Sequence, residues 1–355
     1  MSMIELKRHV VPELGIRFID REIEISRILE MTRGRLHVII GPRGCGKTEL
    51  FKEILYSLSD SERIYPILIT YNIDSTKIYI TDIELLKRTM MERISKIVRY
   101  SSIIETLFTT FIRVREFIVE ILRFREICRK DIVIIVDEFR NVYPGDYSKQ
   151  FLDVIANDVR DLDMKLMEKG GSIRLILSTS DATASELRSQ VGVKVDWYIM
   201  WNLDKKSTFD LLSDVKCPID FELVWKITGG NPREIALLRR LEWDVKKWIS
   251  IKIADVINAL VDYCLSEGEN LNDILRKIKN NFDNIYLLKV WKYLLKYNIV
   301  MYVDSRFEKI SNVPYSDIFL FQVPVYGMVL RQVSERETFK IDPGDVLRAY
   351  GSTCF

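Results

Sequence analysis

The chain has 355 residues, of which 48% are hydrophobic and 29% are charged, with 15 Gly and 9 Pro. This composition excludes collagenous, low-complexity and largely disordered chains, and the length predicts two or three domains. A formal charge of +2, from 53 Lys and Arg against 51 Asp and Glu, excludes a whole-chain field that attracts nucleic acid or membrane, so any such surface is local.

The five cysteines are widely spread, with no CxxC pair and with only His9 and His37 to complement them. This predicts reduced thiols rather than a zinc site or a disulfide framework. The first residues have no signal-peptide pattern, and no run approaches 18 apolar residues. We therefore expect a cytoplasmic protein without membrane contact.

Five short apolar runs predict buried strands. The first, 35–40, is followed by a glycine turn and a helical pattern. Long helical stretches separate most of the other runs, which are 64–71, 132–136, 173–177 and 197–201. Runs without polar alternation are typical of strands covered on both faces, so we predict an α/β fold with a parallel sheet between helices.

The segment 82–130 is predicted to be a helical insertion between the second and third strands. Residues 87–130 hold eleven Lys and Arg against five Glu, a local charge of +6. The segment is either a docking face for an acidic partner or a solvated helix face.

Helical periodicity dominates after Trp201 as far as about Glu267. Two further helices are predicted at 271–279 and 285–297. Two short strands, 299–303 and 307–310, then flank a polar turn and predict a hairpin. Helices that end in a hairpin suggest a winged-helix-like unit. The apolar run 319–330 is compatible with either core or a partner interface.

Residues 41–48 read GPRGCGKT and fit the pattern GxxxxGK[ST] between a predicted strand and a predicted helix. Glycines let backbone N–H groups surround phosphate oxygens, and the helix presents its positive end to them. Lys47 is expected to contact the β and γ phosphates, and Thr48 to ligate Mg²⁺. A chance match in an ordinary glycine turn is the alternative, and the strand–loop–helix context argues against it.

The strand at 132–136 leads directly into Asp137 and Glu138. We predict that Asp137 holds Mg²⁺ through its second coordination shell and that Glu138 polarises a water for attack on the γ phosphate. The alternative is a pair of carboxylates that caps a strand. Ser178 and Thr179 end the next strand, where they either contact the γ phosphate or attacking water or cap the following helix.

Pro232 and Arg233 lie at a predicted helix start. The helix dipole disfavours a cation there unless it faces an anion. We therefore predict that Arg233 contacts the nucleotide phosphates from a lid, the alternative being a surface arginine in a turn. A further hypothesis is that Arg188 acts as an arginine finger toward a neighbouring subunit.

Five segments together resemble the archaeal ATPase family within the STAND and AAA+ groups of P-loop ATPases. They are FIDREIE at 18–24, GPRGCGKT, IVIIVDEF, the STS strand end and TGGNPREIALL. The resemblance spans roughly residues 16–240. It implies an ASCE- or AAA+-like ATPase core (1–203), a helical lid (204–267) and a winged-helix-like C-terminal domain (268–355).

The resemblance also implies that Ile16, Arg17 and Phe18 lie beside the adenine and ribose. Family members commonly carry two arginines in the loop, as in GPRRxGKT, and here Arg43 matches the first whereas Gly44 replaces the second. The GGNPRE stretch further resembles the sensor 2 segment of archaeal replication-initiator ATPases, with Arg233 at the arginine position.

These interpretations give three sets of site residues. The predicted nucleotide contacts are Ile16, Arg17, Phe18, Arg21, Gly41, Pro42, Arg43, Gly44, Cys45, Gly46, Lys47, Thr48, Glu49, Pro232 and Arg233. The predicted catalytic residues are Lys47, Glu138, Ser178, Thr179 and Arg233. The predicted magnesium residues are Thr48 and Asp137.

The predicted function is a slow, Mg²⁺-dependent ATPase that acts as a conformational switch, with an unidentified protein partner, as a monomer or a nucleotide-dependent oligomer. The alternative is a DNA-binding ATPase, an initiator or mobile-element protein, which uses the C-terminal domain. Residues 271–340 carry eleven Lys and Arg against seven Asp and Glu, a modest +4. A third reading is a protein that binds ATP and hardly hydrolyses it alone.

Overall fold

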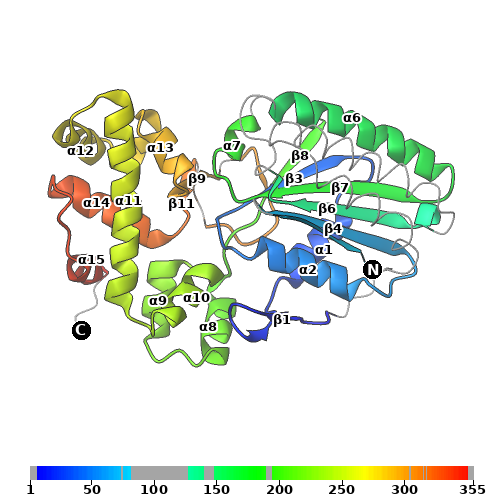
Figure 1. Cartoon of the computed structure of the whole chain (residues 1–355), viewed down its shortest axis with the longest axis horizontal. Coiled ribbons are helices and arrows are strands. Elements are labelled where there is room, and N and C mark those ends of the chain that lie inside the picture. The colour runs from blue at the N-terminus through cyan, green and yellow to red at the C-terminus, as the bar shows by residue number, and fades with distance from the viewer. Residues whose placement is uncertain are drawn as a thin grey trace.

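The structure is a computed structural model that describes residues 6–72, 75–80, 127–139, 148–188, 194–303, 305–314, 316 and 318–350. Figure 1 shows an α/β part, which contains the sheet, beside a mostly helical part formed by the second half of the chain. The predicted insertion 82–130 lies outside the described residues, apart from residues 127–130.

The central sheet has seven strands in the order β10-β8-β3-β7-β6-β4-β5. Six of them are parallel, and β5 is antiparallel to its neighbour β4. The strands are β3 (Leu36–Ile40), β4 (Ile64–Asn72), β5 (Ser75–Ile80), β6 (Asp131–Asp137), β7 (Ser172–Thr179), β8 (Val195–Ile199) and β10 (Glu308–Lys309). The five predicted strands and their parallel pairing are confirmed, whereas β5 and β10 were not predicted as sheet strands.

Helices cover both faces of this sheet, which explains the continuous apolar runs. On β3, Leu36 and Val38 belong to the core cluster that includes α6 (Ser148–Met167), whereas Ile39 belongs to the cluster with α1 (Glu22–Glu30) and α2 (Lys47–Ser57). Figure 1 shows α6 on one side of the sheet and α1 and α2 on the other.

The strand order places β7 between β3 and β6. The chain therefore brings three strand ends to one edge of the sheet: the end that leads into 41–48, the end that carries Asp137 and the end that carries Ser178 and Thr179. This is the arrangement expected of the predicted P-loop ATPase core, since carboxyl ends of parallel strands form the ligand edge of an open sheet.

Four helices follow the sheet: α8 (Lys205–Asp214), α9 (Phe221–Thr228), α10 (Pro232–Arg240) and α11 (Val245–Glu267). Each begins at an Asp or Asn whose side chain accepts from backbone N–H groups of the first turn. The helical structure predicted from Trp201 to about Glu267 is confirmed.

We call the remaining elements, with the exception of β10, the C-terminal unit. They are α12 (Leu271–Asn280), the 3₁₀ helix η3 (Phe282–Leu287), α13 (Trp291–Lys296), β9 (Val300–Tyr302), β11 (Phe319–Phe321), α14 (Pro324–Glu335) and α15 (Pro343–Ala349). The predicted helix at 271–279 is confirmed as α12. The single helix predicted at 285–297 is wrong, because η3 and α13 divide this stretch.

The predicted hairpin is also wrong. β9 pairs with β11, and β10 leaves the C-terminal unit to extend the central sheet beside β8. The physical reason is burial, because Phe307 packs edge-on against Trp197 and Ile310 is buried in the cluster that holds α1 and α2. Apolar contact with the sheet outweighs the local preference for a tight turn.

The described part of the chain also gives the state of the cysteines and the length and polarity of the helices. Cys45, Cys128, Cys217 and Cys264 are free thiols there. Within those same residues, every helix is too short or too polar to cross a membrane.

Candidate functional site

The loop 41–48, which we call the P-loop, connects β3 to α2 at the ligand edge of the sheet. The Lys47 side chain is buried and turns back into the loop, where its Nζ donates to the carbonyl oxygens of Gly41 (3.0 Å) and Pro42 (3.3 Å). The ammonium group is therefore held inside the loop and beside the positive N-terminal end of α2.

Two glycines give the P-loop its shape. Gly46 precedes α2 with φ +99°, and Gly44 has φ +82°. A Cβ on Gly44 would collide with the Cβ of Arg233. The helix α10 thus approaches the loop so closely that the second arginine expected from the family resemblance has no room at this position.

Thr48, Asp137 and Ser178 converge from three elements. The Thr48 hydroxyl donates to Oδ2 of Asp137 at 2.5 Å, and the Ser178 hydroxyl donates to Oδ1 of the same carboxylate at 2.9 Å. Burial, and then the charge of Glu138, raise the pKa of Asp137 above its usual range. The predicted magnesium residues therefore lie together, with Ser178 beside them.

Glu138 lies next to this cluster with φ +56°, a conformation that is uncommon for a residue other than glycine. Its Oε2 accepts from the backbone N–H of Ser180 at 3.2 Å. Thr179 is also buried, but its Oγ1 accepts from the N–H of Asp181. Of the two predicted hydroxyls, Ser178 faces the carboxylates and Thr179 caps its own turn.

The fit of these groups to Mg²⁺ rests on their chemistry. One hydroxyl and one carboxylate are hard oxygen ligands, and Mg²⁺ is usually bound by few protein groups together with phosphates and waters. Among the described residues no cluster of three or more His, Cys, Asp or Glu side chains forms a complete metal site. Thr48 and Asp137 therefore suit a cation that arrives with a nucleotide.

In the segment predicted to lie beside adenine and ribose, Phe18 packs with α1 and α2, whereas Ile16 packs against the other core cluster. Phe18 is buried and stacks on His9 with ring centroids 5.4 Å apart, Ile16 is half-buried in β2 (Ile16–Arg17), and Arg17 is exposed. β2 pairs with β1 (Val10–Val11) as a separate two-stranded sheet.

Arg21 is buried, and other groups of the chain already hold its guanidinium. It donates to the carbonyl oxygens of Cys45 (2.7 Å) and Trp201 (3.0 Å) and pairs with Glu24 at 2.6 Å. The structure thus places Arg21 behind the P-loop, where it fixes the loop backbone.

Glu49, another predicted nucleotide contact, belongs to a charged cluster on α2. His9 Nε2 and Nδ1 each lie 2.7 Å from a carboxylate, of Glu49 and Glu53 respectively. Burial alone would lower the pKa of His9, but hydrogen bonds and charges from the two glutamates outweigh it and raise the pKa to about 9. The pKa of Glu53 falls to about 2, largely through the same hydrogen bonds, against its own burial.

The start of α10 contacts the P-loop directly. The Asn231 side chain caps α10 by accepting from the N–H groups of Arg233 and Glu234. Its Nδ2 donates to the carbonyl oxygen of Arg43 at 3.0 Å, and the N–H of Arg233 also lies 3.3 Å from the oxygen of Gly44. Pro232 occupies the first turn, where no N–H is required.

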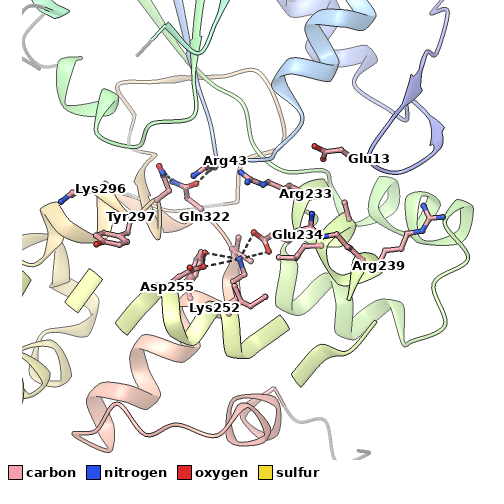
Figure 2. A pocket seen from close by; sticks show the side chains of 17 residues that line it. Glu13, Arg43, Arg233, Glu234, Arg239, Lys252, Asp255, Lys296, Tyr297 and Gln322 are labelled. Atoms are coloured by element: carbon pink, nitrogen blue, oxygen red, sulfur yellow. Dashed lines mark hydrogen bonds and ion pairs between the residues drawn. The ribbon is translucent and has the colours of Figure 1, made fainter. Parts of the chain in front are cut away.

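A cavity of about 870 Å³ lies between α10, α11 and the C-terminal unit, and Arg43 is the P-loop residue among those that line it. Figure 2 shows Arg43 and Arg233 on one wall and the ion pairs of Lys252 on another. Within the described residues the guanidinium groups of Arg43 and Arg233 have no acceptor or acidic partner. Arg233 therefore lies beside the loop with a free cationic group, as its predicted contact with phosphate requires.

Sequence reasoning missed the polar residues that join the P-loop to the second half of the chain. Gln322 Oε1 accepts from the N–H of Arg43 at 2.9 Å, and Asn202 Oδ1 accepts from Nδ2 of Asn231 at 2.9 Å. The sequence signal for Gln322 was present, because it is the polar residue within the apolar run 319–330.

Arg188, which was considered as an arginine finger, is half-buried and lies directly after α7 (Ala184–Leu187).

Comparisons with known proteins place this site in a family. Residues 18–238 match the family described as an ATPase domain predominantly from Archaea. A comparison with curated proteins gives no match.

The solved structures that are similar to the chain include the following two. One is the Aeropyrum pernix ORC2 protein in ADPNP–ADP complexes, at 13% identity and a TM-score of 0.35, over 94% of this chain and 99% of that one. The other is C. elegans PCH-2, at 12% identity and a TM-score of 0.29, over 62% of this chain and 60% of that one. These likenesses are distant, and the P-loop fold rests on the strand order instead.

Proposed function

We propose that this chain, which belongs to the family of ATPase domains found predominantly in Archaea, binds and hydrolyses ATP with Mg²⁺ and uses the nucleotide as a conformational switch. The observation that carries the proposal is the convergence of Thr48 and Ser178 on the Asp137 carboxylate, at the edge where the P-loop begins. A purely structural carboxylate at a strand end has no need of two hydroxyls from separate elements.

The residues divide the chemistry among them. Lys47 and the N–H groups of the P-loop bind phosphate oxygens, and Arg233 adds a second positive charge from the lid. Glu138 orients a water and accepts its proton, while Ser178 holds the Asp137 carboxylate in place. A Mg²⁺ ion bound by Thr48 and, through its second coordination shell, by Asp137 would neutralise charge on the phosphates.

The finer parts of the proposal concern the second half of the chain. We assign α8 to α11 the role of a lid and the C-terminal unit that of a winged-helix-like domain, as in the STAND and AAA+ groups. Contacts of α10 and Gln322 with the P-loop support a switch, because they give both parts a direct connection to the nucleotide site. The use of the C-terminal unit for DNA remains the alternative.

The test compares two variants in ATP turnover and nucleotide binding. Glu138→Gln keeps the shape of the side chain but cannot accept a proton, so turnover falls by about 10² to 10⁴-fold while ATP binding persists. Lys47→Ala removes the buried cation and weakens nucleotide binding itself. Glu168→Gln and Lys165→Ala, both exposed on the α6 side of the sheet, are the matched controls.

Turnover in Glu138→Gln equal to that of the parent would contradict the assignment of Glu138. Binding unaffected by Lys47→Ala would contradict the nucleotide site as a whole. The same assay at low salt with duplex DNA separates the alternatives, since a DNA-using ATPase shows salt-dependent binding and stimulated turnover.

A further inference from the structure

Gln322 connects the C-terminal unit to the backbone of the P-loop. The residue lies between β11 and α14 and is only 2% exposed. Its Oε1 accepts from the N–H of Arg43 at 2.9 Å, and its Nε2 donates to the Val300 oxygen at 3.3 Å and lies 3.5 Å from Oδ1 of Asn298. One buried amide therefore binds both the P-loop and the strand β9.

The Arg43 peptide is held from its other side as well. Its carbonyl oxygen accepts from Nδ2 of Asn231, which also donates to Oδ1 of Asn202. Nδ2 of Asn202 in turn donates to the backbone oxygen of Gln322 at 3.0 Å. Arg43, Gln322, Asn202 and Asn231 thus form a closed ring of hydrogen bonds that joins the P-loop, the end of β8, α10 and the C-terminal unit.

Asn298 extends this ring to the loop that follows β7. Its Oδ1 accepts from the N–H of Ala182 at 3.1 Å. Ala182 lies four residues after Ser178, whose hydroxyl binds Asp137. The two loops that meet the nucleotide in the proposed function therefore each donate a backbone N–H to the C-terminal unit.

The hydrogen bonds of Gln322, which is buried, and of Asn298, which is half-buried, oppose movement of one partner alone. If the P-loop shifts while Gln322 stays, the buried amide of Gln322 loses its hydrogen bond to the loop, which is costly. The lower-energy response is for Gln322 and Asn298 to move with the loops or to release them together. This behaviour is what a two-state connection between sites requires.

We propose that Gln322 and Asn298 are positioning residues that couple the P-loop and the loop after β7 to the C-terminal unit. Nucleotide binding changes the backbone of the two loops, and the amides transmit this change to β9 and β11. The inference rests on the proposed function, since it takes the P-loop as the nucleotide site. A purely structural role would make Gln322 contribute to stability without linking the C-terminal unit to the nucleotide.

Hydrogen–deuterium exchange on the full chain tests the coupling, with and without saturating Mg-ADP or a slowly hydrolysed ATP analogue. In the parent, nucleotide changes amide exchange within 299–303 and 319–323 by about 5-fold or more, the lower end of usual coupling between sites. Gln322→Leu abolishes this response while nucleotide still binds. Gln332→Leu on α14, whose side chain has no hydrogen bond in the described part of the chain, is the matched control and keeps it.

Gln322→Glu is a second variant, which tests the coupling even if Gln322→Leu fails to fold. The carboxylate still accepts from Arg43 but no longer donates toward Val300 and Asn298. The response in 319–323 therefore persists at saturating nucleotide, and that in 299–303 is lost. Coupling between two sites is reciprocal. Gln322→Leu is therefore expected to change the nucleotide Kd as well, by about the same factor by which it reduces the exchange response.

Two results would overturn the inference. One is nucleotide binding to the parent with no change in exchange in the C-terminal unit, and the other is a response that survives in Gln322→Leu. Both leave the ATP site itself intact. Absence of nucleotide binding to the parent would instead contradict the proposed function.

Discussion

At the residue scale, the close approach of Arg233 explains why glycine stands at the fourth position of the P-loop. Gly44 has φ +82°, and a Cβ there would collide with Arg233. The family resemblance leads us to expect a second arginine at this position, and it does not explain why the chain has Gly44 there. The tertiary contact explains the glycine, since the space that an arginine side chain needs is already filled by Arg233 at the start of α10.

We predict that Gly44→Ala destabilises the protein more than Gly170→Ala does. The two glycines have similar φ angles, +82° and +86°, but a Cβ added at Gly44 would meet other atoms within 4 Å, whereas one added at Gly170 would not. Gly170→Ala costs about 1 kcal/mol of unfolding free energy from backbone strain, whereas Gly44→Ala costs about 1 to 3 kcal/mol more from overpacking. Denaturant unfolding of both variants measures the difference, and equal losses would refute the close contact.

At the scale of elements, the N-terminal segment is fastened to the P-loop helix by charge. His9 lies between Glu49 and Glu53 of α2, and Glu53 Oε1 and Oε2 also accept from the backbone N–H groups of Arg8 and His9. The same segment carries Phe18, which stacks on His9. The position of the predicted adenine-side residues thus depends on a protonated histidine.

This arrangement predicts a loss of stability at alkaline pH. The pKa of His9 is about 9 in the folded chain against a usual value of 6.5, so its contribution is complete below pH 6.5 and is lost as the pH rises through about 9. The full shift corresponds to roughly 3 kcal/mol. Unfolding free energies measured at pH 6 and pH 9.5 give this loss in the parent and a smaller one in His9→Gln. Equal losses in the two proteins would show that His9 does not carry the effect.

At the scale of the whole molecule, a charged network in which Lys252 and Glu234 are buried joins the helix α10 to α11 and the C-terminal unit. Lys252 pairs with Glu234 at 2.9 Å and with Asp255 at 3.4 Å, and the Tyr326 hydroxyl donates to Asp255 at 2.8 Å. Glu234 also accepts from Nε1 of Trp248. Glu234, Lys252, Asp255 and Tyr326 line the same cavity as Arg43 and Arg233 (Figure 2).

We predict that Lys252→Met destabilises the chain by about 3 to 5 kcal/mol, because it leaves Glu234 buried without its cation. Adding Glu234→Gln recovers part of this loss, since a neutral amide still accepts from Trp248. Lys246→Met on the exposed side of α11 is the control and has little effect. Thermal or denaturant unfolding measures all three, and a double variant no more stable than the single one would contradict the reasoning.

The sequence by itself determined five strands of the central sheet and most of the helices, and it predicted the chemistry of the site. Continuous apolar runs specify strands buried on both faces, and the P-loop pattern predicts a phosphate site, because both signals are local in the chain. The tertiary structure decided what local patterns do not encode. It paired β10 with the central sheet rather than with β9, and it turned Arg21 toward the loop backbone. It also brought Gln322 to Arg43, 279 residues away in the sequence. Such contacts follow from burial and hydrogen-bond satisfaction in the whole fold, which no short stretch of sequence contains.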